Sequence, residues 1–409
     1  MKLMWLDEKR KIKKTYDDLL TDLSTLQSYS KYIHQSDPYI IFKKIIQAMV
    51  LGNNITILDS TFSEEEITLL NVEMYRLQEE TPTPSLNFKN YLQLTSKISD
   101  SFSVSLYTSG TTGVPKKITH SLNTLIRNVR AGERFNDNIW AFAYNPTHIA
   151  GLQVFFQAFY NKNPMIYVFE EVSNNIERLF IEQKITHISA TPTFYRTKIL
   201  PFVGSVNSVR RVTFGGEKMD PLAKEKLQSI FPSAQYRNIY ASTEAGSLFT
   251  TSGEFFTIPE RYASLIKIID NELLVHESLL GDSDHLELVN DWYRTGDIVE
   301  QGSVNKFRFI SRKTETINIG GYKVSPYEIE EAILATNLIR NVRVRSKKNR
   351  ITGNILIAEI EKMTESIDIE LETKIRHELS KRLQKWKIPR LYKFVDKIEE
   401  TRTGKKMRK

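Results

Sequence analysis

Hydrophobic residues recur along the chain either at the spacing of a helix or in short runs typical of a strand. Stretches with these two patterns alternate. Residues 40–51 carry apolar side chains at helical spacing, and a turn of two asparagines leads from them into the short apolar strand 55–58. The acidic run 64–66 then marks the start of another helix. This order of helix, strand and helix continues along most of the chain.

Between residues 103 and 240 the same alternation predicts layers of helices and strands. Strands are expected at 103–107, 165–169, 187–190, 209–214 and 236–240, and helices at 121–130, 176–182 and 221–230. The longest uncharged stretch, 139–161, is interrupted by Asn145 and Pro146, so it predicts a strand, a loop and a helix instead of a membrane span. The expected fold class is therefore α/β, with layered helices and largely parallel sheets.

The pattern changes twice in the last part of the chain. Short strands separated by turns are expected at 264–269, 272–276 and 285–289, which predicts a small β subdomain. Strands at 306–311, 340–344 and 355–361 and helices at 326–335 and 369–384 follow, and they predict a separate α+β domain. We therefore expect a large N-terminal domain over 1–310, a hinge at 311–316 and a C-terminal domain over 317–409.

The composition is that of an ordinary globular protein, and it excludes several kinds of site. Hydrophobic residues make up 40% of the 409 residues. Cysteine is absent, which excludes disulfides, thiolate metal sites and a covalent thioester on the protein itself. The N-terminus carries charges where a signal peptide needs an apolar core. We therefore expect a soluble, cytoplasmic protein.

The net charge of +8 collects largely at residues 9–14 and 405–409. Neither place has the aromatic residues of a nucleic-acid-binding stripe, so nucleic acid is not an expected partner. A solvated basic face that favours anionic ligands accounts for the charge. Zinc and a Ser-His-Asp triad are not expected either, because the sequence lacks cysteine, an H-E-x-x-H pair and a G-x-S-x-G elbow.

A dense cluster of hydroxyl groups and glycines directly follows the strand that ends at Tyr107. The cluster and the lysine behind it are Thr108, Ser109, Gly110, Thr111, Thr112, Gly113 and Lys116. The glycines allow positive φ and close approach of the backbone, and the hydroxyls, N–H groups and lysine can surround an anion. No Lys-Ser or Lys-Thr pair stands at Walker A spacing, so this is not a P-loop. The cluster predicts a triphosphate-binding loop.

This loop resembles the phosphate loop of the adenylate-forming superfamily, which comprises acyl-CoA synthetases, adenylation domains of nonribosomal peptide synthesis and luciferases. The segment from Asn238 to Glu244 is similar to the family's Tyr-Gly-x-Thr-Glu motif, with Ala241 at the glycine position. The resemblance implies that Tyr240 stacks on adenine, that Thr243 contacts the α-phosphate and that Glu244 is an oxygen ligand of Mg²⁺. Taken alone, a Thr-Glu pair is more often a helix N-cap.

Two more motifs follow in the family's order. Gly216 and Glu217 match the glycine-rich turn that lies against the adenine and the acyl pocket in the family. An ordinary turn from strand to helix fits these two residues nearly as well. Residues 293–297 match the Tyr-Arg-Thr-Gly-Asp signature, which implies that Asp297 accepts hydrogen bonds from the ribose hydroxyls.

Residues 311–324 are similar to the hinge between the two family domains and the loop behind it. The resemblance implies that Arg312 contacts ribose or phosphate, and that Gly320 and Gly321 let the backbone approach the pantetheine arm of CoA. Thr314 stands at the pivot where many relatives carry Asp or Lys, so the pivot residue is left open.

Near the end of the chain, residues 401–405 match the motif whose lysine is catalytic. The resemblance implies that Lys405 bridges the attacking carboxylate and the α-phosphate, where charge grows in the transition state. A disordered basic tail is the alternative interpretation. His148 matches the family's His-x-x-Gly turn and is expected to gate or line the acyl pocket, with a structural role as its alternative.

Together these motifs imply an enzyme that uses ATP and Mg²⁺ to convert a small carboxylic acid into its acyl-AMP. Transfer to a thiol follows, with CoA as the expected acceptor and co-substrate. Thr243, Glu244 and Lys405 are the expected catalytic residues.

One alternative is an enzyme that loads a carrier protein in trans, and another is a non-catalytic binding or scaffold subunit. A P-loop ATPase or kinase is excluded by the missing Walker lysine. The identity of the acid and the oligomeric state are not predicted.

The phosphate loop begins earlier in this chain than in most members of the family. The N-terminal subdomain is therefore expected to be trimmed, and residues 1–36 have no clear counterpart. The trimming suggests two hypotheses, namely a more open active face or a second subunit that covers it.

Overall fold

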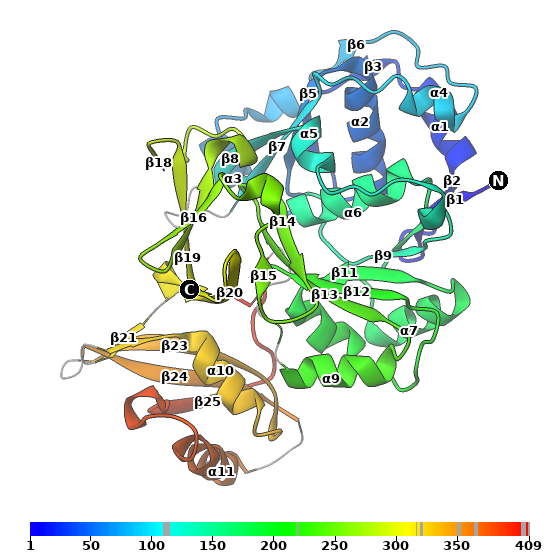
Figure 1. Cartoon of the computed structure of the whole chain (residues 1–409). Coiled ribbons are helices and arrows are strands. Elements are labelled where there is room, and N and C mark those ends of the chain that lie inside the picture. The colour runs from blue at the N-terminus through cyan, green and yellow to red at the C-terminus, as the bar shows by residue number, and fades with distance from the viewer. Residues whose placement is uncertain are drawn as a thin grey trace.

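The computed structural model of the chain describes residues 1–108, 115–217, 219, 221–315, 317–319, 322–349, 353–363, 367–401 and 406–407. The fold is mixed α/β, with a large N-terminal domain and a smaller C-terminal domain (Figure 1). The fold class predicted from the sequence is confirmed. None of the helices among these residues is long and apolar enough to cross a membrane.

The largest sheet of the N-terminal domain is parallel in its centre and closed at each edge by an antiparallel strand. Its strand order is β14 (Gly246–Thr251), β13 (Gln235–Ser242), β12 (Arg211–Gly215), β11 (His187–Ala190), β9 (Trp140–Phe142), β10 (Met165–Tyr167), β1 (Leu3–Asp7) and β2 (Ile12–Thr15). The first residues of the chain, for which the sequence offered no counterpart, thus extend this sheet, since β1 pairs in parallel with β10.

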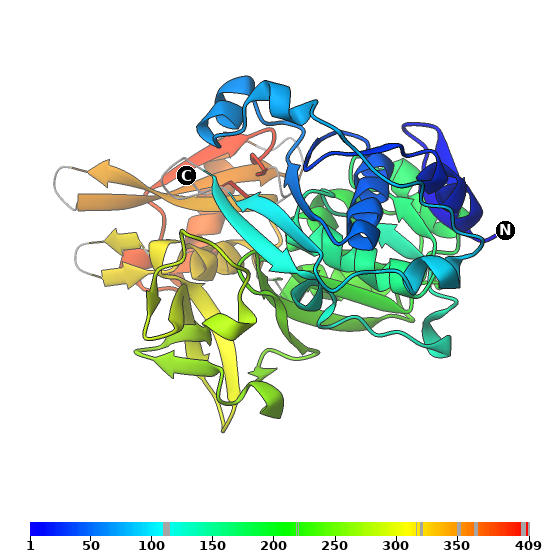
Figure 2. The same cartoon turned by 90° about the horizontal axis from the view of Figure 1, so that it is seen from above.

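A second sheet lies beside the first and contains the strands that flank the predicted phosphate loop. Its order is β4 (Tyr32–His34), β5 (Asn54–Leu58), β7 (Ser103–Thr108) and β8 (Lys116–Ser121). A core of buried side chains joins it to the first sheet through α2 (Pro38–Leu51) and α6 (Ile149–Tyr160). On the other face of the large sheet, α7 (Ser173–Glu182) and α9 (Pro221–Ile230) cover a second core. Figure 2 shows these layers from above.

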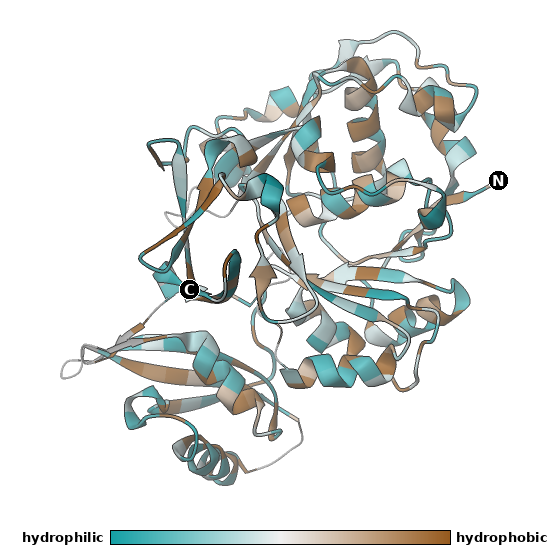
Figure 3. Cartoon of the chain, viewed as in Figure 1, coloured by the Kyte–Doolittle hydropathy of each residue, from teal (hydrophilic) through white to brown (hydrophobic). Residues whose placement is uncertain are grey.

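Local sequence signals explain where the helices begin and end. Asp37 caps α2 by accepting the N–H of Tyr39, and Gly52 ends this helix in the left-handed region at φ 69°. Capping boxes start α1 (Tyr16–Ser24) and α3 (Glu64–Leu69). Helix α2 is apolar on most of its surface because it is buried between the two sheets (Figure 3). The shorter helices are α4 (Tyr91–Thr95), α5 (Leu122–Ile126) and α8 (Pro192–Phe194), and a two-stranded ribbon joins β3 (Ser28–Tyr29) to β6 (Thr81–Pro82).

The expected β subdomain is an antiparallel sheet with its own core around Phe249, Phe256 and Phe307. Its strands are β15 (Phe256–Thr257), β20 (Lys306–Arg312), β19 (Trp292–Gln301), β17 (Glu272–His276) and β16 (Ile266–Ile269), with β18 (Leu288–Val289) paired to β19.

The C-terminal domain has a separate hydrophobic core that includes Ile329, Ile360 and Ile375. Its elements are β21 (Ile317–Ile319), β22 (Tyr322–Val324), α10 (Pro326–Leu334), β23 (Ile339–Asn349), β24 (Gly353–Lys362), α11 (Asp368–Ser380) and β25 (Leu391–Val395). Strands β23, β24 and β25 form one sheet on which α10 and α11 pack.

Several predicted boundaries differ from the observed ones. The helix expected over 121–130 ends at Ile126, because Arg127 and Asn128 turn away to donate to the carbonyls of Ala245, Leu279 and Ser247. The helix expected to reach residue 384 ends at Ser380, and β23 is longer than the strand expected at 340–344. The strand expected at 285–289 is confined to β18. For the helix that ends at Ile126, contacts distant in sequence decide the limit, and local patterns carry little information about such contacts.

Candidate active site

Asp297 lies at the centre of the predicted nucleotide site and is buried, with 3% of its surface exposed. One carboxylate oxygen accepts the hydroxyl of Tyr240 at 2.5 Å, and the other accepts the Nε–H of Arg312 at 2.9 Å. The backbone N–H of Asp297 is bound to the hydroxyl of Thr295. These contacts bring together three predicted residues from strands β13, β19 and β20. A carboxylate offers about four lone-pair positions, so Asp297 keeps acceptor capacity for hydroxyls of a ligand.

The ring of Tyr240 packs inside the β subdomain core. Its centroid lies 5.7 Å from that of Phe249, 6.2 Å from that of Phe256 and 6.1 Å from that of Phe307. Burial, together with the adjacent Asp297 carboxylate, raises the pKa of Tyr240 well above its ordinary value, so the phenol stays protonated and donates. The ring predicted to stack on adenine is thus 9% exposed, and it is fixed by both its face contacts and its hydroxyl.

Thr243 and Glu244 follow β13, and His120 of β8 makes a hydrogen bond to the backbone of Thr243. The Nε2 atom of His120 lies 2.7 Å from the carbonyl oxygen of Thr243, and His120 is fully buried. Burial lowers the pKa of His120 to about 4, so the ring is neutral at physiological pH and donates from Nε2 to the carbonyl. Gly281 packs on this ring so closely that a Cβ there would lie 2.8 Å from it. The strand behind the phosphate loop is therefore tied to the Thr243–Glu244 pair.

Glu217 ends the glycine-rich turn, in which Gly216 has φ 80°. One carboxylate oxygen accepts the backbone N–H and the hydroxyl of Thr193, at 3.0 and 2.6 Å. The other accepts the backbone N–H of Lys406 at 2.9 Å, and the Arg196 guanidinium lies 4.0 Å away. Glu217 thus contacts both domains, and the red C-terminal segment in Figure 1 runs between them. Asn238 lies next to this turn, paired with Phe214 across β12 and β13.

His148 is the N-cap residue of α6 and lies beside a buried acid. Its Nε2 atom is 3.8 Å from a carboxylate oxygen of Asp59, which also accepts the side-chain N–H of Asn145 at 2.9 Å. Asp59 is 6% exposed. The contact ties the end of β5 to the start of α6, which is compatible with either interpretation of His148 offered by the sequence.

Part of the predicted site lies outside the described residues. These predictions concern Ser109, Gly110, Thr111, Thr112, Gly113, Gly320, Gly321 and Lys405. Of the loop's two ends, Thr108 and Lys116 are paired to each other across β7 and β8. Lys406, the neighbour of Lys405, has its side chain buried in the C-terminal domain, with Nζ 2.7 Å from the carbonyl oxygen of Val342 and 3.4 Å from a Glu330 oxygen.

Three residues of this region were missed by the sequence interpretation. His120, Thr193 and Lys406 occupy their positions through partners between 24 and 189 residues away in the chain. Only His120 carried a local signal, since it is a histidine at the penultimate position of the strand that follows the loop. The other two have no pattern that a single sequence reveals.

Within the described ranges, no group of three or more His, Asp or Glu side chains is arranged around a metal position. A magnesium ion at Glu244 would therefore depend on phosphate oxygens for most of its ligands, which is how Mg²⁺ is usually bound beside nucleotides.

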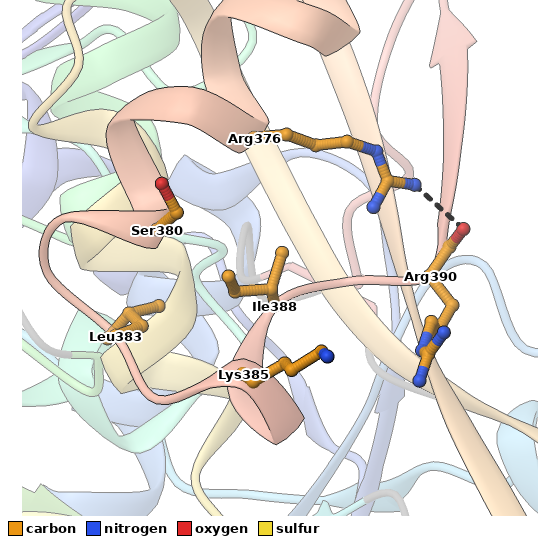
Figure 4. A pocket seen from close by; sticks show the side chains of 6 residues that line it. All are labelled: Arg376, Ser380, Leu383, Lys385, Ile388 and Arg390. Carbon is orange, nitrogen blue, oxygen red and sulfur yellow. Dashed lines mark hydrogen bonds between the residues drawn. The ribbon is translucent and has the colours of Figure 1, made fainter.

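A surface cavity on the C-terminal domain is distinct from all these residues. It is lined by Arg376, Ser380, Leu383, Lys385, Ile388 and Arg390 (Figure 4). Arg376 spans its wall and donates to the carbonyl oxygens of Pro389 and Arg390 at 2.9 and 2.8 Å. The arginine therefore shapes the loop after α11, and no residue predicted for the active site lines the cavity.

Comparison with protein families matches two models to this chain. The model described as AMP-binding enzyme covers residues 20–301, and that of the AMP-binding enzyme C-terminal domain covers residues 328–405.

Among curated proteins, the chain is 24% identical over 331 residues to 2-succinylbenzoate–CoA ligase of Lactococcus lactis subsp. lactis strain IL1403, across 76% of this chain and 70% of the relative. It is 26% identical over 351 residues to surfactin synthase subunit 2 of Bacillus subtilis strain 168, across 73% of this chain and 10% of that longer protein.

Two solved structures share the fold. One is o-succinylbenzoate coenzyme A synthetase (MenE) from Bacillus subtilis in complex with ATP and magnesium ion, with a TM-score of 0.71 and 17% identity over 100% of this chain and 96% of that one. The other is ATP-bound MatB from Rhodopseudomonas palustris, with a TM-score of 0.73 and 17% identity over 99% and 94%.

Proposed function

Because this chain belongs to the AMP-binding enzyme family, we propose that it is an AMP-forming acid–thiol ligase of the acyl-CoA synthetase type. ATP, Mg²⁺ and a carboxylic acid would give acyl-AMP and pyrophosphate, and the acyl group would then pass to the thiol of CoA. The observation that carries the proposal is the buried Asp297 carboxylate, which Tyr240 and Arg312 orient while it retains acceptor capacity for two ribose hydroxyls.

In the first step the residues of the N-terminal domain position the nucleotide. Asp297 would accept from the ribose, Arg312 would add positive charge near ribose or phosphate, and Thr243 would contact the α-phosphate. A magnesium ion held by Glu244 and phosphate oxygens would neutralise triphosphate charge. Most of the acceleration would come from positioning and charge stabilisation, as in phosphoryl transfer generally.

The phosphate loop is assigned to the triphosphate on chemical grounds. Its hydroxyls, glycines and Lys116 form the kind of anion-binding concavity that successive N–H groups create. Asn238, Gly216 and Glu217 are assigned to the adenine side of the site, and His148 to the acyl pocket. Gly320 and Gly321 are assigned to the thiol.

Lys405 is the proposed catalytic lysine, and the packing of its neighbour supports this choice over Lys406. The Lys406 side chain is 3% exposed and directed at Glu330, so its charge serves the interior of the C-terminal domain. Lys405 would bridge the acid's carboxylate and the α-phosphate, where negative charge accumulates in the transition state.

The division into a domain over 1–310, a hinge at 311–316 and a domain over 317–409 is part of the proposal. It is supported by the separate core of the C-terminal part, which begins at Ile317. Rotation of that domain between the two half-reactions would remove Lys405 and bring in the thiol. A cytoplasmic location is part of the proposal, and the absence of cysteine is compatible with a reducing compartment.

Two acceptors are to be distinguished. CoA is favoured because the relatives matched over most of their own length are CoA ligases. A carrier protein acting in trans is the second candidate, favoured by the similarity to surfactin synthase subunit 2. 2-Succinylbenzoate is the first acid to test, because it is named in the relatives' activity.

The test is exchange of labelled pyrophosphate into ATP, dependent on acid, over a panel that begins with 2-succinylbenzoate. Lys405→Ala should abolish exchange and spare thioester formation from supplied acyl-adenylate, and Lys409→Ala serves as a matched control. If no acid of a broad panel supports exchange by the unaltered protein, the proposed function is wrong.

A further inference from the structure

Lys406 carries a buried charge next to the proposed catalytic lysine. Its Nζ atom lies 2.7 Å from the carbonyl oxygen of Val342 and 3.4 Å from a carboxylate oxygen of Glu330, and the two side chains are 3% and 4% exposed. The second oxygen of Glu330 accepts the backbone N–H of Val344 at 2.8 Å. Burial of a charged lysine destabilises the folded state unless the ammonium group is paired in this manner. The contacts with Val342 and Glu330 therefore favour one position of Lys406.

The segment around Lys406 is attached to the C-terminal domain by the backbone as well. The N–H of Met407 donates to the carbonyl of Glu399 at 2.9 Å, and Glu400 pairs with Lys406 as an antiparallel bridge. Arg343 of β23 donates to the carbonyl of Met407 at 2.6 Å. The described residues on the two sides of 402–405 are thus joined to each other and to the sheet.

The backbone of the same lysine faces the other domain. Its N–H donates to Glu217 at 2.9 Å, and Thr193 holds the other oxygen of that carboxylate. Lys406 is therefore anchored in the C-terminal domain through its side chain and bound to the N-terminal domain through its main chain.

We propose that Lys406 is a positioning residue for the adenylation step, which rests on the proposed function. The Lys406–Glu330 pair fixes the register of the tail in the C-terminal domain, and the contact with Glu217 docks that tail at the active site. Consecutive Cα atoms are about 3.8 Å apart, so fixing Lys406 restricts where Lys405 can act. A charged pair suits this task because an apolar side chain can slide in its pocket, whereas a buried ion pair specifies one alignment.

Three variants separate positioning from simple stability. Lys406→Met removes the charge and keeps most of the chain length. Glu330→Gln combined with Lys406→Met removes both charges, while the amide oxygen can still accept the N–H of Val344, so folding should be affected little. Lys387→Met serves as the matched control. It removes the ion pair between Lys387 and Glu328, which is more exposed than the pair of Lys406 with Glu330. Glu328 and Glu330 both lie in helix α10.

We expect Lys406→Met to lower kcat of acid-dependent pyrophosphate exchange by about 10- to 100-fold, with the KM for ATP changed less than about threefold. Thioester formation from supplied acyl-adenylate should stay within about twofold of the unaltered protein, because Lys405 is not needed there. The double variant should recover the unfolding temperature but not the exchange rate. Lys387→Met should change neither. Hydrogen–deuterium exchange at the C-terminal peptide should be faster in Lys406→Met than in the control.

A double variant that regains both stability and exchange would show a merely structural role and overturn the proposal. Equal loss of both half-reactions in Lys406→Met, at unchanged hydrogen exchange of the tail, would overturn it as well. In both of these outcomes the unaltered protein still catalyses exchange, so the proposed function survives. Absence of exchange in the unaltered protein would instead refute the proposed function, and this inference with it.

Discussion

Asp297 and Glu217 are two carboxylates of the candidate active site, and the protein holds them in different ways. Asp297 is bound by Tyr240 of β13 and by Arg312, the last residue of β20, which lies at the start of the proposed hinge. Glu217 is bound by Thr193 on one side and by Lys406 of the C-terminal segment on the other. Both of these partners of Asp297 therefore precede the C-terminal domain, whereas the surroundings of Glu217 depend on where that domain lies.

We infer from this difference that the two acids serve different parts of the reaction. We expect Arg312 to stay with β20 when the C-terminal domain rotates, so that Asp297 keeps both partners in every step in which the nucleotide is bound. A site completed by the other domain serves only the step that needs that arrangement. Substitutions at Asp297 should therefore affect both half-reactions, and substitutions at Glu217 mainly the first.

The largest effect is expected for Asp297→Asn. The amide keeps the shape but loses the charge that Arg312 faces and one acceptor for the nucleotide, so we expect pyrophosphate exchange to fall by about 100-fold or more. Stability should fall by only about 1 kcal/mol, because the Arg312 side chain is 48% exposed and water takes up part of its charge. Exchange assays and thermal unfolding measure the two effects.

Asp291→Asn is the matched control, because Asp291 is exposed, lies near the same strand and has φ 70°, which asparagine tolerates. A thioester-forming step left at full rate in Asp297→Asn would contradict the assignment of Asp297 to both half-reactions.

The pH dependence of the free energy of unfolding tests whether His120 is buried, neutral and bound to the carbonyl of Thr243. The pKa of the buried His120 is lowered to about 4, so the folded state keeps it neutral while the unfolded state binds a proton below about pH 6.5. Stability is therefore lost as pH falls from about 6.5 to 4, by at most about 3 kcal/mol, and the loss levels off below that range. His120→Gln should flatten this limb in urea unfolding at a series of pH values.

His285→Gln provides the comparison, since His285 is exposed and its replacement should leave the acid limb as it is. His187 is partly buried and its pKa is also lowered to about 4, so a second such contribution remains in both variants. An acid limb in His120→Gln as steep as in the control would contradict the neutral, carbonyl-bound histidine.

A smaller and more selective effect is expected for Glu217→Gln. With its oxygen directed at Thr193 the amide still accepts both Thr193 hydrogen bonds, but its NH₂ group cannot accept the N–H of Lys406. We expect acid-dependent exchange to fall by about tenfold, equivalent to about 1.4 kcal/mol, and thioester formation from supplied acyl-adenylate to stay within about twofold. Equal loss in both steps would show that Glu217 does not depend on the position of the C-terminal domain.

The sequence predicted the parts of this picture that local patterns encode. The alternation of helices and strands was confirmed, because short-range periodicity reflects which face each element buries. The motif residues Tyr240, Asp297 and Arg312 do come together, although nothing in the sequence indicated that the first two share a hydrogen bond.

The contacts that could not be predicted link positions far apart in the chain. His120 meets Thr243 across 123 residues, and Lys406 meets Glu330 across 76. Such pairs depend on how whole layers pack, and a single sequence holds no periodic trace of that packing. The extension of the large sheet by β1 was missed for the same reason, since its partner β10 lies far along the chain.

The smallest effect is expected at Tyr240, and it separates two roles of one side chain. Tyr240→Phe keeps the ring among Phe249, Phe256 and Phe307 but removes the donor to Asp297, so we expect a loss of about 1 kcal/mol in stability and a rise of a few-fold in the KM for ATP. Tyr240→Leu also removes the ring. If stacking on adenine is the main role, the leucine variant raises the KM for ATP far more than the phenylalanine variant. Equal KM values in the two variants would instead leave orientation of Asp297 as the role of Tyr240, since the hydroxyl is the only group that both variants lack.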